Sequence, residues 1–517
     1  MPELINKLKD ILGAENVLDS GLDFLSSDVN GLDKVAALAI KPMSSDELSK
    51  AVKVITDHNY TVIARGGATS YTGGVIPDRN NSVVIDTSAL NNIIEINTKD
   101  MYITVESGIT WKALHEALSK TDVRTPFWGP LSGARATVGG AVSQNAILWG
   151  STSHDVSASS VLSVEVVLAD GTILNTGSAG SGLKPFFRNY GPDLTGIFLG
   201  DTGALGIKTK VTLRLIHRPA KVDFLSFNFN ERSKISRALQ TIAREGVAST
   251  CFGMDPVLQH QRIKRASMAK GVKAIKSMLA SADNKLEAIK DATRIATKGK
   301  RFIDEHGYSM HIIVEGNSKA EIEEKVERAR SICLQEGSEI ANSVPRMLYG
   351  DPFVDMTTSV GPAGERWLPM HGLFALSDGD KAWEQIEKLF ERFSKKFEEH
   401  EIVVGYLLAA VSTTTFVVEP VFYWPGPRTI WSETVLSASD LSKLQNFPEN
   451  AETNRIVNEA REALNNLFDE LGAAHLQIGK KYHYREHLQE PSSSLLESLK
   501  NAVDPKRLMN PKSLGLD

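Results

Sequence analysis

The sequence predicts an α+β protein that consists of two domains and a C-terminal helical segment. At 517 residues, the chain is too long for one ordinary hydrophobic core. Helix and strand patterns alternate up to Pro219, whereas the region that follows has strands in which apolar residues alternate, as in an antiparallel sheet. A mixed helix–strand domain followed by a second sheet of this kind favours an α+β fold in which the second domain covers the first.

Changes in pattern set the expected domain boundaries. We place the first domain at residues 1–219, with its core at about 41–219, and the covering domain at 220–450. Residues 451–517 are mostly helical, and we expect them to return to the first domain.

The elements of the first domain follow from apolar spacing. The stretches "PELINKLKDIL" and "DELSKAVKVITDHN" have helical spacing, and Ser45 is a candidate cap for the second one. "YTVIAR", "SVVIDTS" and "YITVES" predict strands, and "WKALHEALSK" predicts a helix. "VLSVEVVLADGTILNT" predicts a hairpin, because Asp170-Gly171 joins two β-rich runs.

The covering domain repeats a strand and a charged helix. "VDFLSFNFN" and "YSMHIIVEG" alternate like half-buried antiparallel strands. A long charged helix is expected after each strand, at 231–245 and at 319–336.

Composition restricts the class of protein and its compartment. The 42% hydrophobic and 23% charged fractions are typical of a globular protein, and a net charge of −5 argues against a nucleic-acid binder. Cys251 and Cys333 are too few for a disulfide framework. The N-terminus lacks a secretory pattern, and the longest apolar run, 402–411, is half of the roughly 20 residues that span a membrane. We therefore expect a cytoplasmic protein.

The segment 260–302 differs from the rest of the chain, because it holds twelve Lys and Arg residues and only three acids. Met268, Val272, Ile275 and Leu279 form an apolar stripe with helical spacing. This basic amphipathic helix predicts either peripheral contact with an anionic membrane or a solvated insert that packs on its own domain.

Three segments are rich in glycine and small residues. The first is "ARGGATSYTGG" (64–74), the second is "GPLSGARATVGGAVSQNAILWGSTSHD" (129–155) and the third is "GDTGALGIKTKVTLRL" (200–215). Their spacing fits neither G-x-G-x-x-G nor a P-loop. Backbone N–H groups in such segments can still form a nest for a diphosphate.

In this order, and together with "VEVVLADGTIL", the three segments resemble the flavin domain of the vanillyl-alcohol oxidase/p-cresol methylhydroxylase superfamily. The resemblance covers about 41–219 and returns in "AVDPKRLMNPKSLGL". It implies a PCMH-type FAD-binding domain, a cap domain like that of FAD-linked oxidases, and bound FAD. The implied FAD contacts are Arg65, Gly66, Gly67, Thr69, Ser70 and Gly73 in the first segment, Pro130, Thr137, Gly139, Gly140, Asn145, Gly150 and Ser151 in the second, Gly203, Leu205, Gly206 and Ile207 in the third, and Asn510.

Polar and aromatic groups that could meet a substrate gather in three later stretches. "PAGERWLPMHGLF" contains His371, "EPVFYWPGPRTIW" contains Tyr423, and "AAHLQIGKKYHYREHL" contains His475, Tyr484 and Arg485. "YREHL" resembles the phenol-oxidising branch, which implies that Tyr484 and Arg485 hold a substrate phenolate. The preferred function is therefore hydride abstraction to flavin N5 from a para-substituted phenol or a benzylic alcohol.

Two alternatives stay open. The 2-hydroxy-acid dehydrogenase branch carries metal ligands in G-H-x-G-D-G-N-x-H and G-E-H-G, and neither string occurs, so we predict no metal. A hydroxy-acid dehydrogenase is nevertheless the first alternative. In it, His371, His475 or His483 supplies a general base, and Arg366 or Arg485 binds the carboxylate. The second is an FAD-binding subunit without turnover.

The resemblance also bears on cofactor attachment and partners. Branches that attach FAD covalently use a histidine where this chain has Ala68, or one in the strand that corresponds to "STTTFVVEPVF", so we predict non-covalent FAD. The expected partners are a small-molecule substrate and an electron acceptor, which is oxygen, a cytochrome or a quinone. A homodimer is compatible with the composition.

Overall fold

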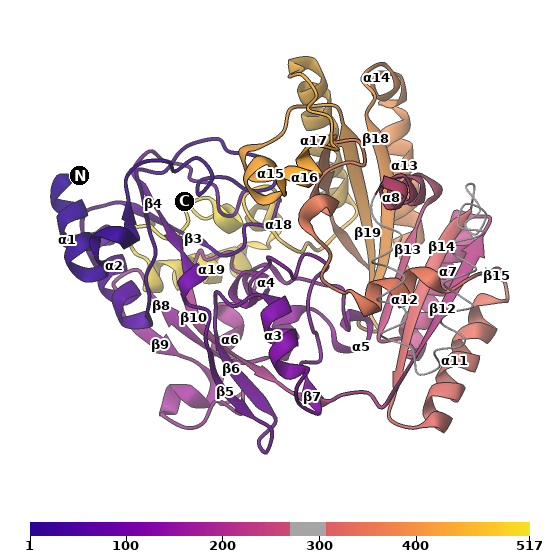
Figure 1. The fold of residues 1–517 in the computed structure, drawn as a ribbon, viewed down its shortest axis with the longest axis horizontal. Coiled ribbons are helices and arrows are strands. Elements are labelled where there is room, and N and C mark those ends of the chain that lie inside the picture. The colour runs from indigo at the N-terminus through magenta and orange to yellow at the C-terminus, as the bar shows by residue number, and fades with distance from the viewer. Residues whose placement is uncertain (269–306) are drawn as a thin grey trace.

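The computed structural model describes residues 1–268 and 307–517. Figure 1 shows two sheet-based parts side by side: the N-terminal part, indigo to magenta, and the later part, mostly orange. The last stretch of the chain, in yellow, returns to the N-terminal part. The mixed α+β architecture with a separate antiparallel-sheet domain is the one that the sequence predicts.

The first sheet of the N-terminal part supports the first glycine-rich segment. Its strand order is β1-β2-β4-β3, in which β2, β4 and β3 run parallel. Helices α1 and α2 pack through buried leucines, valines and isoleucines into the same core as this sheet. The hydroxyl of Ser44, one residue before the expected cap, accepts from Glu47 N–H and begins α2. The bounds are α1 (Pro2–Leu12), β1 (Val17–Leu18), β2 (Leu38–Ile40), α2 (Ser45–Asp57), β3 (Thr61–Arg65) and β4 (Ser82–Asp86).

The second sheet is antiparallel and has the order β5-β6-β10-β8-β9. The predicted hairpin is confirmed, because β8 pairs antiparallel with β9 across a turn at Gly171, where φ is 85°. A short ribbon of β7 and β11 lies at the end of this part. The bounds are β5 (Ile93–Asn97), β6 (Tyr102–Glu106), α3 (Trp111–Leu118), β7 (Val123–Arg124), α4 (Val138–Gln144), α5 (Ser151–His154), β8 (Val161–Val167), β9 (Ile173–Asn175), α6 (Leu194–Ile197), β10 (Ile207–Arg214) and β11 (Ile216–His217).

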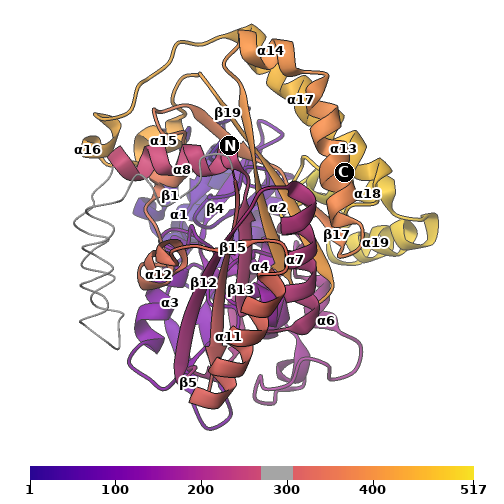
Figure 2. The same ribbon diagram turned by 90° about the vertical axis from the view of Figure 1, so that its right-hand side faces the viewer.

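The cap domain, as we call the second part, is built on one sheet of order β15-β12-β14-β13-β18-β19-β16, with β17 also paired to β19. Helices α7, α11 and α13 cover one face of this sheet, as Figure 2 shows. The bounds are β12 (Lys221–Phe229), α7 (Arg232–Glu245), β13 (Thr250–Met254), α8 (Pro256–Met268), β14 (Tyr308–Gly316), α11 (Lys319–Cys333), β15 (Ser338–Glu339), α12 (Ser343–Gly350), β16 (Arg366–Pro369), β17 (Gly372–Ala375), α13 (Gly379–Glu391), α14 (Ser394–Glu399), β18 (Val403–Val411), β19 (Thr415–Trp424), α15 (Ile430–Val435) and α16 (Ala438–Leu441).

Only part of the C-terminal segment packs on the first domain. Helix α17 (Ala451–Glu470) instead buries Ile456, Leu464 and Phe468 in the core of the cap domain, so the expectation that residues 451–470 return to the first domain is wrong. Helices α18 (Tyr484–His487) and α19 (Glu490–Val503) follow, and Met509 is buried in the core of the first sheet.

A buried ion pair fixes this return. Lys500 and Asp504 are fully buried, and their Nζ and Oδ2 atoms lie 2.6 Å apart. Lys500 also donates to the carbonyl oxygens of Ala204 and Met509, at 2.7 and 2.9 Å. The Asp504 carboxylate accepts from the N–H groups of Leu508 and Met509. One cation thus joins the end of the chain to the third glycine-rich segment.

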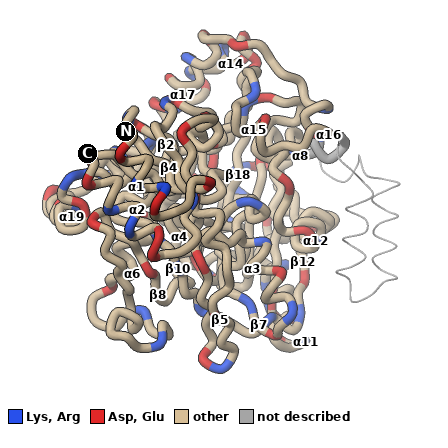
Figure 3. Tube along the Cα trace, turned by 60° about the vertical axis from the view of Figure 1, so that its left-hand side comes forward, with Lys and Arg blue, Asp and Glu red and all other residues tan. Residues whose placement is uncertain are grey.

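Positive and negative residues are interspersed over the described chain in the view of Figure 3. Among the described residues, no helix is long and apolar enough to cross a membrane. The basic segment predicted at 260–302 belongs to α8 as far as Met268, and its remainder lies outside the described residues.

Replacing Lys500 with methionine should destabilise the protein by about 3–5 kcal/mol, because Asp504 would stay buried without its cation. Urea unfolding of Lys500→Met measures this change. Lys506→Met is the control, since Lys506 is exposed and, among the described residues, its ammonium makes one 3.4 Å hydrogen bond, to Thr56 O. Equal unfolding midpoints for the two variants would contradict the role given to Lys500.

Candidate active site

A cavity lies where the three glycine-rich segments meet the cap domain. Its lining comes from the first segment and β3, from the second and third segments, from Thr87 and Ser107, from five places in the cap domain, and from Gln477. The cap-domain residues are Arg262, Thr358, Ser359, Trp367, His371, Leu407, Ala409 and Glu419. Both domains are therefore needed to form one cavity, as is usual for sites at domain interfaces.

The first glycine-rich segment presents backbone donors to this cavity. The N–H groups of residues 66–70 donate to no described protein atom. Ala68 adopts a left-handed backbone, with φ at 51°. At Gly67 an added Cβ would lie 2.2 Å from the Arg135 carbonyl oxygen, so only glycine lets the two segments approach this closely. Free N–H groups in such a nest suit the oxygens of a phosphate.

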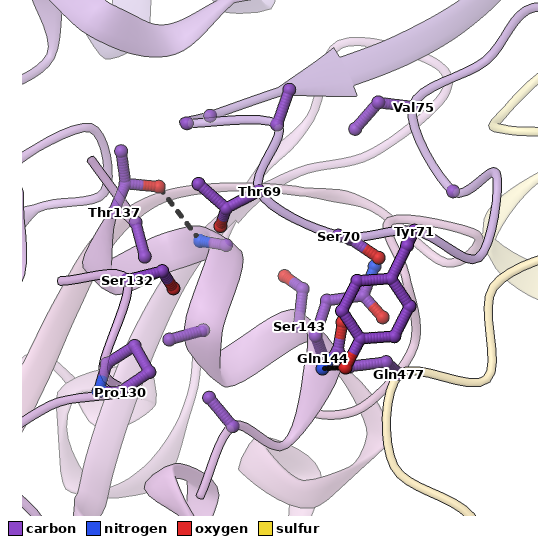
Figure 4. A pocket seen from close by; sticks show the side chains of 18 of the residues that line it. Thr69, Ser70, Tyr71, Val75, Pro130, Ser132, Thr137, Ser143, Gln144 and Gln477 are labelled. Carbon is purple, nitrogen blue, oxygen red and sulfur yellow. Dashed lines mark hydrogen bonds between the residues drawn. The ribbon is translucent and has the colours of Figure 1, made fainter. Parts of the chain in front are cut away.

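The second segment contributes a short helix that packs tightly. Thr137 begins α4, and its Oγ1 accepts from Gly140 N–H at 3.2 Å, which is the dashed line in Figure 4. An added Cβ at Gly139 would meet Ser107 Cβ at 2.5 Å, so this glycine lets α4 approach the end of β6.

Several buried polar atoms of the lining lack a described partner. On the side of the glycine-rich segments they include Ser107 Oγ, Gln144 Oε1 and Thr202 Oγ1. Unpaired buried polar atoms are costly, and they become satisfied when a polar ligand binds. The free N–H groups and these three atoms fit the diphosphate and polar edges of FAD.

Most residues implied as FAD contacts line the cavity, and the others shape the backbone around it. Gly73, Asn145 and Gly150 take left-handed conformations with φ of 73°, 52° and 86°. Those in the lining are Arg65, Gly66, Gly67, Thr69, Ser70, Pro130, Thr137, Gly139, Gly140, Gly203, Gly206 and Ile207, and those outside it are Gly73, Asn145, Gly150, Ser151, Leu205 and Asn510.

The residues outside the lining have partners within the protein. Gly73 N–H donates to Asp28 Oδ2 at 3.0 Å, and Ser151 Oγ accepts from Leu148 N–H at 3.0 Å. The Leu205 side chain belongs to a hydrophobic core. Their contribution to the cavity is therefore indirect.

Asn510 connects two of the glycine-rich segments. Its side-chain amide is buried and donates to Gly74 O at 2.8 Å and to Thr202 O at 2.6 Å. Its own N–H donates to Val62 O, and Val62 N–H in turn donates to Leu508 O. The C-terminal return thus adds to β3 and holds the first and third segments together.

Two of the cations in the lining are already paired or bonded. Lys208 Nζ lies 2.6 Å from Asp201 Oδ1 in a buried ion pair. Arg65 donates to the carbonyl of Ser27 and lies over Phe24, and burial lowers its pKa to about 10. By contrast, Arg262, which α8 places in the cap side of the lining, has no hydrogen bond or ion pair with any described residue.

The cap side also holds a buried polar network around His371. His371 Nε2 lies 2.9 Å from the Tyr71 hydroxyl and 3.2 Å from Glu419 Oε2. Gln477 Nε2 donates to the same hydroxyl at 3.0 Å, and Figure 4 shows the Tyr71 ring beside Gln477. His371 Nδ1 has no described partner. The network joins the first glycine-rich segment, the cap sheet and the C-terminal return.

Burial and the nearby Glu419 carboxylate hold the pKa of Tyr71 well above its ordinary value. Tyr71 therefore keeps its proton at neutral pH and acts as a neutral hydroxyl. The group in this network that can accept a proton is therefore His371 or Glu419.

His475 positions His371. Its Nδ1 lies 2.8 Å from the His371 carbonyl oxygen, and its ring stacks on Tyr482 with centroids 4.1 Å apart. The Tyr482 hydroxyl oxygen in turn accepts a hydrogen bond from the backbone N–H of His371, at 2.7 Å. Burial lowers the pKa of His475 to about 4, so it is neutral at pH 7.

Tyr484, Arg485, His475 and Tyr423 were expected to meet substrate, and the structure places all four outside the cavity lining. Arg485 pairs with Glu497 on α19 at 2.5 Å, and Tyr484 packs against the core of the first domain. Tyr423 is buried in an apolar cluster beside Trp367. The expected phenolate clamp of Tyr484 and Arg485 is therefore not formed at the cavity.

Sequence reasoning did not single out Tyr71 as a site residue, although it lies within the first glycine-rich segment. Glu419 and Gln477 lie within the polar stretches quoted above, but the sequence assigns no function to either residue. Strand pairing could have identified Glu419 as a lining residue. Leu407 on β18 is its register partner, and both residues line the cavity.

Two family models match the chain. Residues 36–177 match the model described as "FAD binding domain", and residues 477–514 match "FAD linked oxidases, C-terminal domain". These are the parts that carry the glycine-rich cavity wall and the C-terminal return.

Curated relatives include oxidoreductases of hydroxy acids. A mitochondrial D-lactate dehydrogenase (cytochrome) of Saccharomyces cerevisiae is 21% identical over 99% of this chain and 79% of its own length. A probable D-lactate dehydrogenase of Danio rerio is 34% identical over 35% of each chain. Glycolate oxidase subunit GlcD of Bacillus subtilis is 28% identical over 46% of this chain and 49% of its own. This chain thus matches half or less of the length of the last two.

Solved structures share the whole fold. p-Cresol methylhydroxylase with substrate bound gives a TM-score of 0.75 at 16% identity, over 100% of this chain and 97% of that chain. Alkyldihydroxyacetonephosphate synthase gives 0.69 at 17% identity, over 99% and 85%. At these identities the likeness establishes the fold, a PCMH-type domain with an antiparallel-sheet cap.

Replacing Asn510 with alanine should weaken FAD retention and lower stability by about 1–3 kcal/mol, because two buried carbonyls would lose their donor. Flavin absorbance after gel filtration and the thermal midpoint measure the two effects. Asn91→Ala is the control, since Asn91 is exposed and its side chain donates to the nearby Ser88 carbonyl, within its own loop. Full FAD retention by Asn510→Ala would refute the proposed link between the two segments.

Proposed function

We propose that this chain, which matches the FAD-binding domain and the C-terminal domain of FAD-linked oxidases, oxidises a small 2-hydroxy acid. Bound FAD supplies the acceptor for a hydride, and the protein supplies binding, orientation and a proton acceptor. The observation that carries the proposal is an arginine, Arg262, that has no partner among the described residues and lines the same cavity as a buried histidine–carboxylate pair.

Arg262 is the group that we assign to the substrate carboxylate. Three cations line the cavity in the described part of the chain, and Arg262 is the one whose guanidinium is not already bonded there. A guanidinium binds a carboxylate through two parallel hydrogen bonds, which also fix the orientation of the substrate.

The hydroxyl proton of a 2-hydroxy acid has to leave when the hydride leaves. We assign its acceptance to His371 Nδ1, which has no described partner although His371 lines the cavity. When Nε2 carries the other proton, it can donate to Glu419, 3.2 Å away, and the carboxylate stabilises the imidazolium that forms. Tyr71, fixed as a neutral hydroxyl by its raised pKa, holds the ring in place.

Part of the cap-side wall is apolar and suits the carbon skeleton of a substrate. Trp367, Leu407 and Ala409 line it, and the Trp367 ring meets the Tyr71 ring edge-on at 5.4 Å. Displacement of water by these side chains favours hydride transfer over side reactions.

The aromatic wall supports a second candidate, a para-substituted phenol or benzylic alcohol. In that case Tyr71 would donate a hydrogen bond to the substrate oxygen. Anaerobic mixing with D- and L-2-hydroxy acids and, separately, with 4-alkylphenols distinguishes the two candidates by bleaching of the flavin. Bleaching by phenols alone would reject the hydroxy-acid proposal.

We also propose that FAD is held without a covalent bond, since Ala68 occupies the place where one branch has a histidine. Release of the yellow cofactor into the supernatant after acid precipitation supports this proposal, whereas retention in the pellet contradicts it. The electron acceptor and the peripheral membrane contact stay predictions.

His371→Asn should lower the rate of flavin reduction by about 100- to 10,000-fold, because the proton acceptor is lost. FAD should stay bound, since the backbone contacts of residue 371 with Tyr482 and His475 remain. Stopped-flow reduction under anaerobic conditions measures the rate. His115→Asn is the control, because His115 is a partly buried histidine beside Trp128, outside the cavity. An unchanged rate in His371→Asn would remove His371 from the mechanism.

Arg262→Met should raise KM for a 2-hydroxy acid by about 10- to 100-fold, because the substrate carboxylate would lose its hydrogen bonds to a charged group. Neutral alcohols should be unaffected. Steady-state kinetics on both substrate types measure the difference, with Lys264→Met, an exposed residue of the same helix, as the control. If KM rises equally for neutral substrates, Arg262 does not bind a carboxylate.

A further inference from the structure

A second cluster of chemically active side chains lies outside the cavity, between α17 and α18. Asp469 comes from the C-terminal turn of α17, His483 directly precedes α18, and His487 is the last residue of α18. Asp469 Oδ2 lies 2.7 Å from His483 Nδ1 and 2.9 Å from His487 Nε2. One ligand atom of each residue lies within 4.8 Å of the other two.

These residues have the chemistry of a metal site. Imidazole nitrogen and carboxylate oxygen are the protein ligands of Zn²⁺ and related divalent ions, at about 2.0–2.2 Å. Two ligands at such bond lengths lie roughly 3.3 Å apart in a tetrahedron. A shift of Asp469 Oδ2 by about half an ångström from its present position would open this space.

The groups around the cluster also fit a metal site. Glu462 lies two helical turns before Asp469, and its Oε1 is 3.6 Å from His483 Nε2. This is the ring nitrogen that would remain free when Nδ1 binds a metal. A carboxylate on the outer nitrogen of a metal-bound histidine fixes the ring orientation and strengthens the ligand.

The aspartate of the cluster is mostly buried, whereas the two histidines are partly exposed to solvent. The Asp469 side chain is 12% exposed, whereas those of His483 and His487 are 30% and 49% exposed. The carboxylate is therefore held in place by packing, and the open side lets an ion and a water molecule enter.

We propose that Asp469, His483 and His487 bind a divalent transition-metal ion, with Zn²⁺ as the best match, and that Glu462 positions His483. Water completes the tetrahedron, as in other sites with three protein ligands. This site is independent of the proposed function, because none of its residues lines the cavity.

The position of the site gives the metal a structural consequence. Helix α17 packs in the cap domain, whereas α18 is joined to the C-terminal return, where Arg485 bonds to Glu497 and to the Gly515 carbonyl. A metal ion would connect the cap domain to the segment that carries Asn510. Binding should therefore stabilise the closed arrangement of both domains around FAD.

Without a metal, two imidazole N–H groups can donate to the same carboxylate oxygen. The test separates this arrangement from a metal site. Holoenzyme with FAD bound is stripped with a chelator, dialysed against ZnCl₂ and analysed for bound zinc, and the thermal midpoint is recorded with and without Zn²⁺. CoCl₂ replaces zinc in a parallel sample, because tetrahedral Co²⁺ with nitrogen and oxygen ligands absorbs visible light.

We expect one zinc ion per chain, a higher thermal midpoint with Zn²⁺, and loss of both in His487→Ala and in His483→Ala. Glu462→Gln should weaken zinc binding by about 10-fold, as removal of an outer carboxylate does. The control is His217→Ala, since His217 is an exposed histidine beside one carboxylate, Asp122 at 3.6 Å. FAD absorbance confirms that each variant is folded.

Two results would overturn the proposal. One is the absence of stoichiometric zinc in the wild-type chain, which would leave the hydrogen-bonded arrangement. The other is zinc binding that is equally strong in His487→Ala, His483→Ala and His217→Ala, which would place the ion elsewhere.

Discussion

The cavity depends on one buried amide. Asn510 donates two hydrogen bonds to carbonyl oxygens of Gly74 and Thr202, which lie 436 and 308 residues away along the chain. Neither segment has regular structure at that point that could hold it alone. Because the Lys500–Asp504 pair fixes the backbone next to Asn510, the end of the chain decides how far apart the first and third glycine-rich segments stand. A cofactor that contacts both segments needs this spacing.

The cavity wall contains hydrogen-bonding groups that have no partner among the described residues and are therefore available to a ligand. Five consecutive N–H groups at residues 66–70 and the oxygens of Ser107, Gln144 and Thr202 have no described partner. Their desolvation costs free energy in the empty protein, and a polar ligand offsets this cost. The FAD-binding domain is thus less stable alone than with its cofactor.

The cap domain supplies the other half of the site through strand alternation. Leu407, Ala409 and Glu419 face the cavity because β18 and β19 place alternate residues on one face of the sheet. Residues further away hold this half in position: His475 and Tyr482 fix the backbone of His371 on both sides. The residues proposed to be catalytic and the residues that orient them therefore come from different parts of the chain.

The sequence by itself determined the α+β class, the hairpin at Asp170-Gly171 and the FAD-binding segments, and most of the FAD contacts implied for these segments line the cavity. Local spacing of glycine and apolar residues is sufficient for these, since backbone conformation and burial follow from nearest neighbours. It did not determine which polar groups meet in the cavity. Tyr484 and Arg485 stand next to each other in a motif, yet α18 directs Arg485 to Glu497. Only the tertiary structure joined Tyr71, His371 and Glu419, because side chains that are 300 residues apart are brought together by packing between domains.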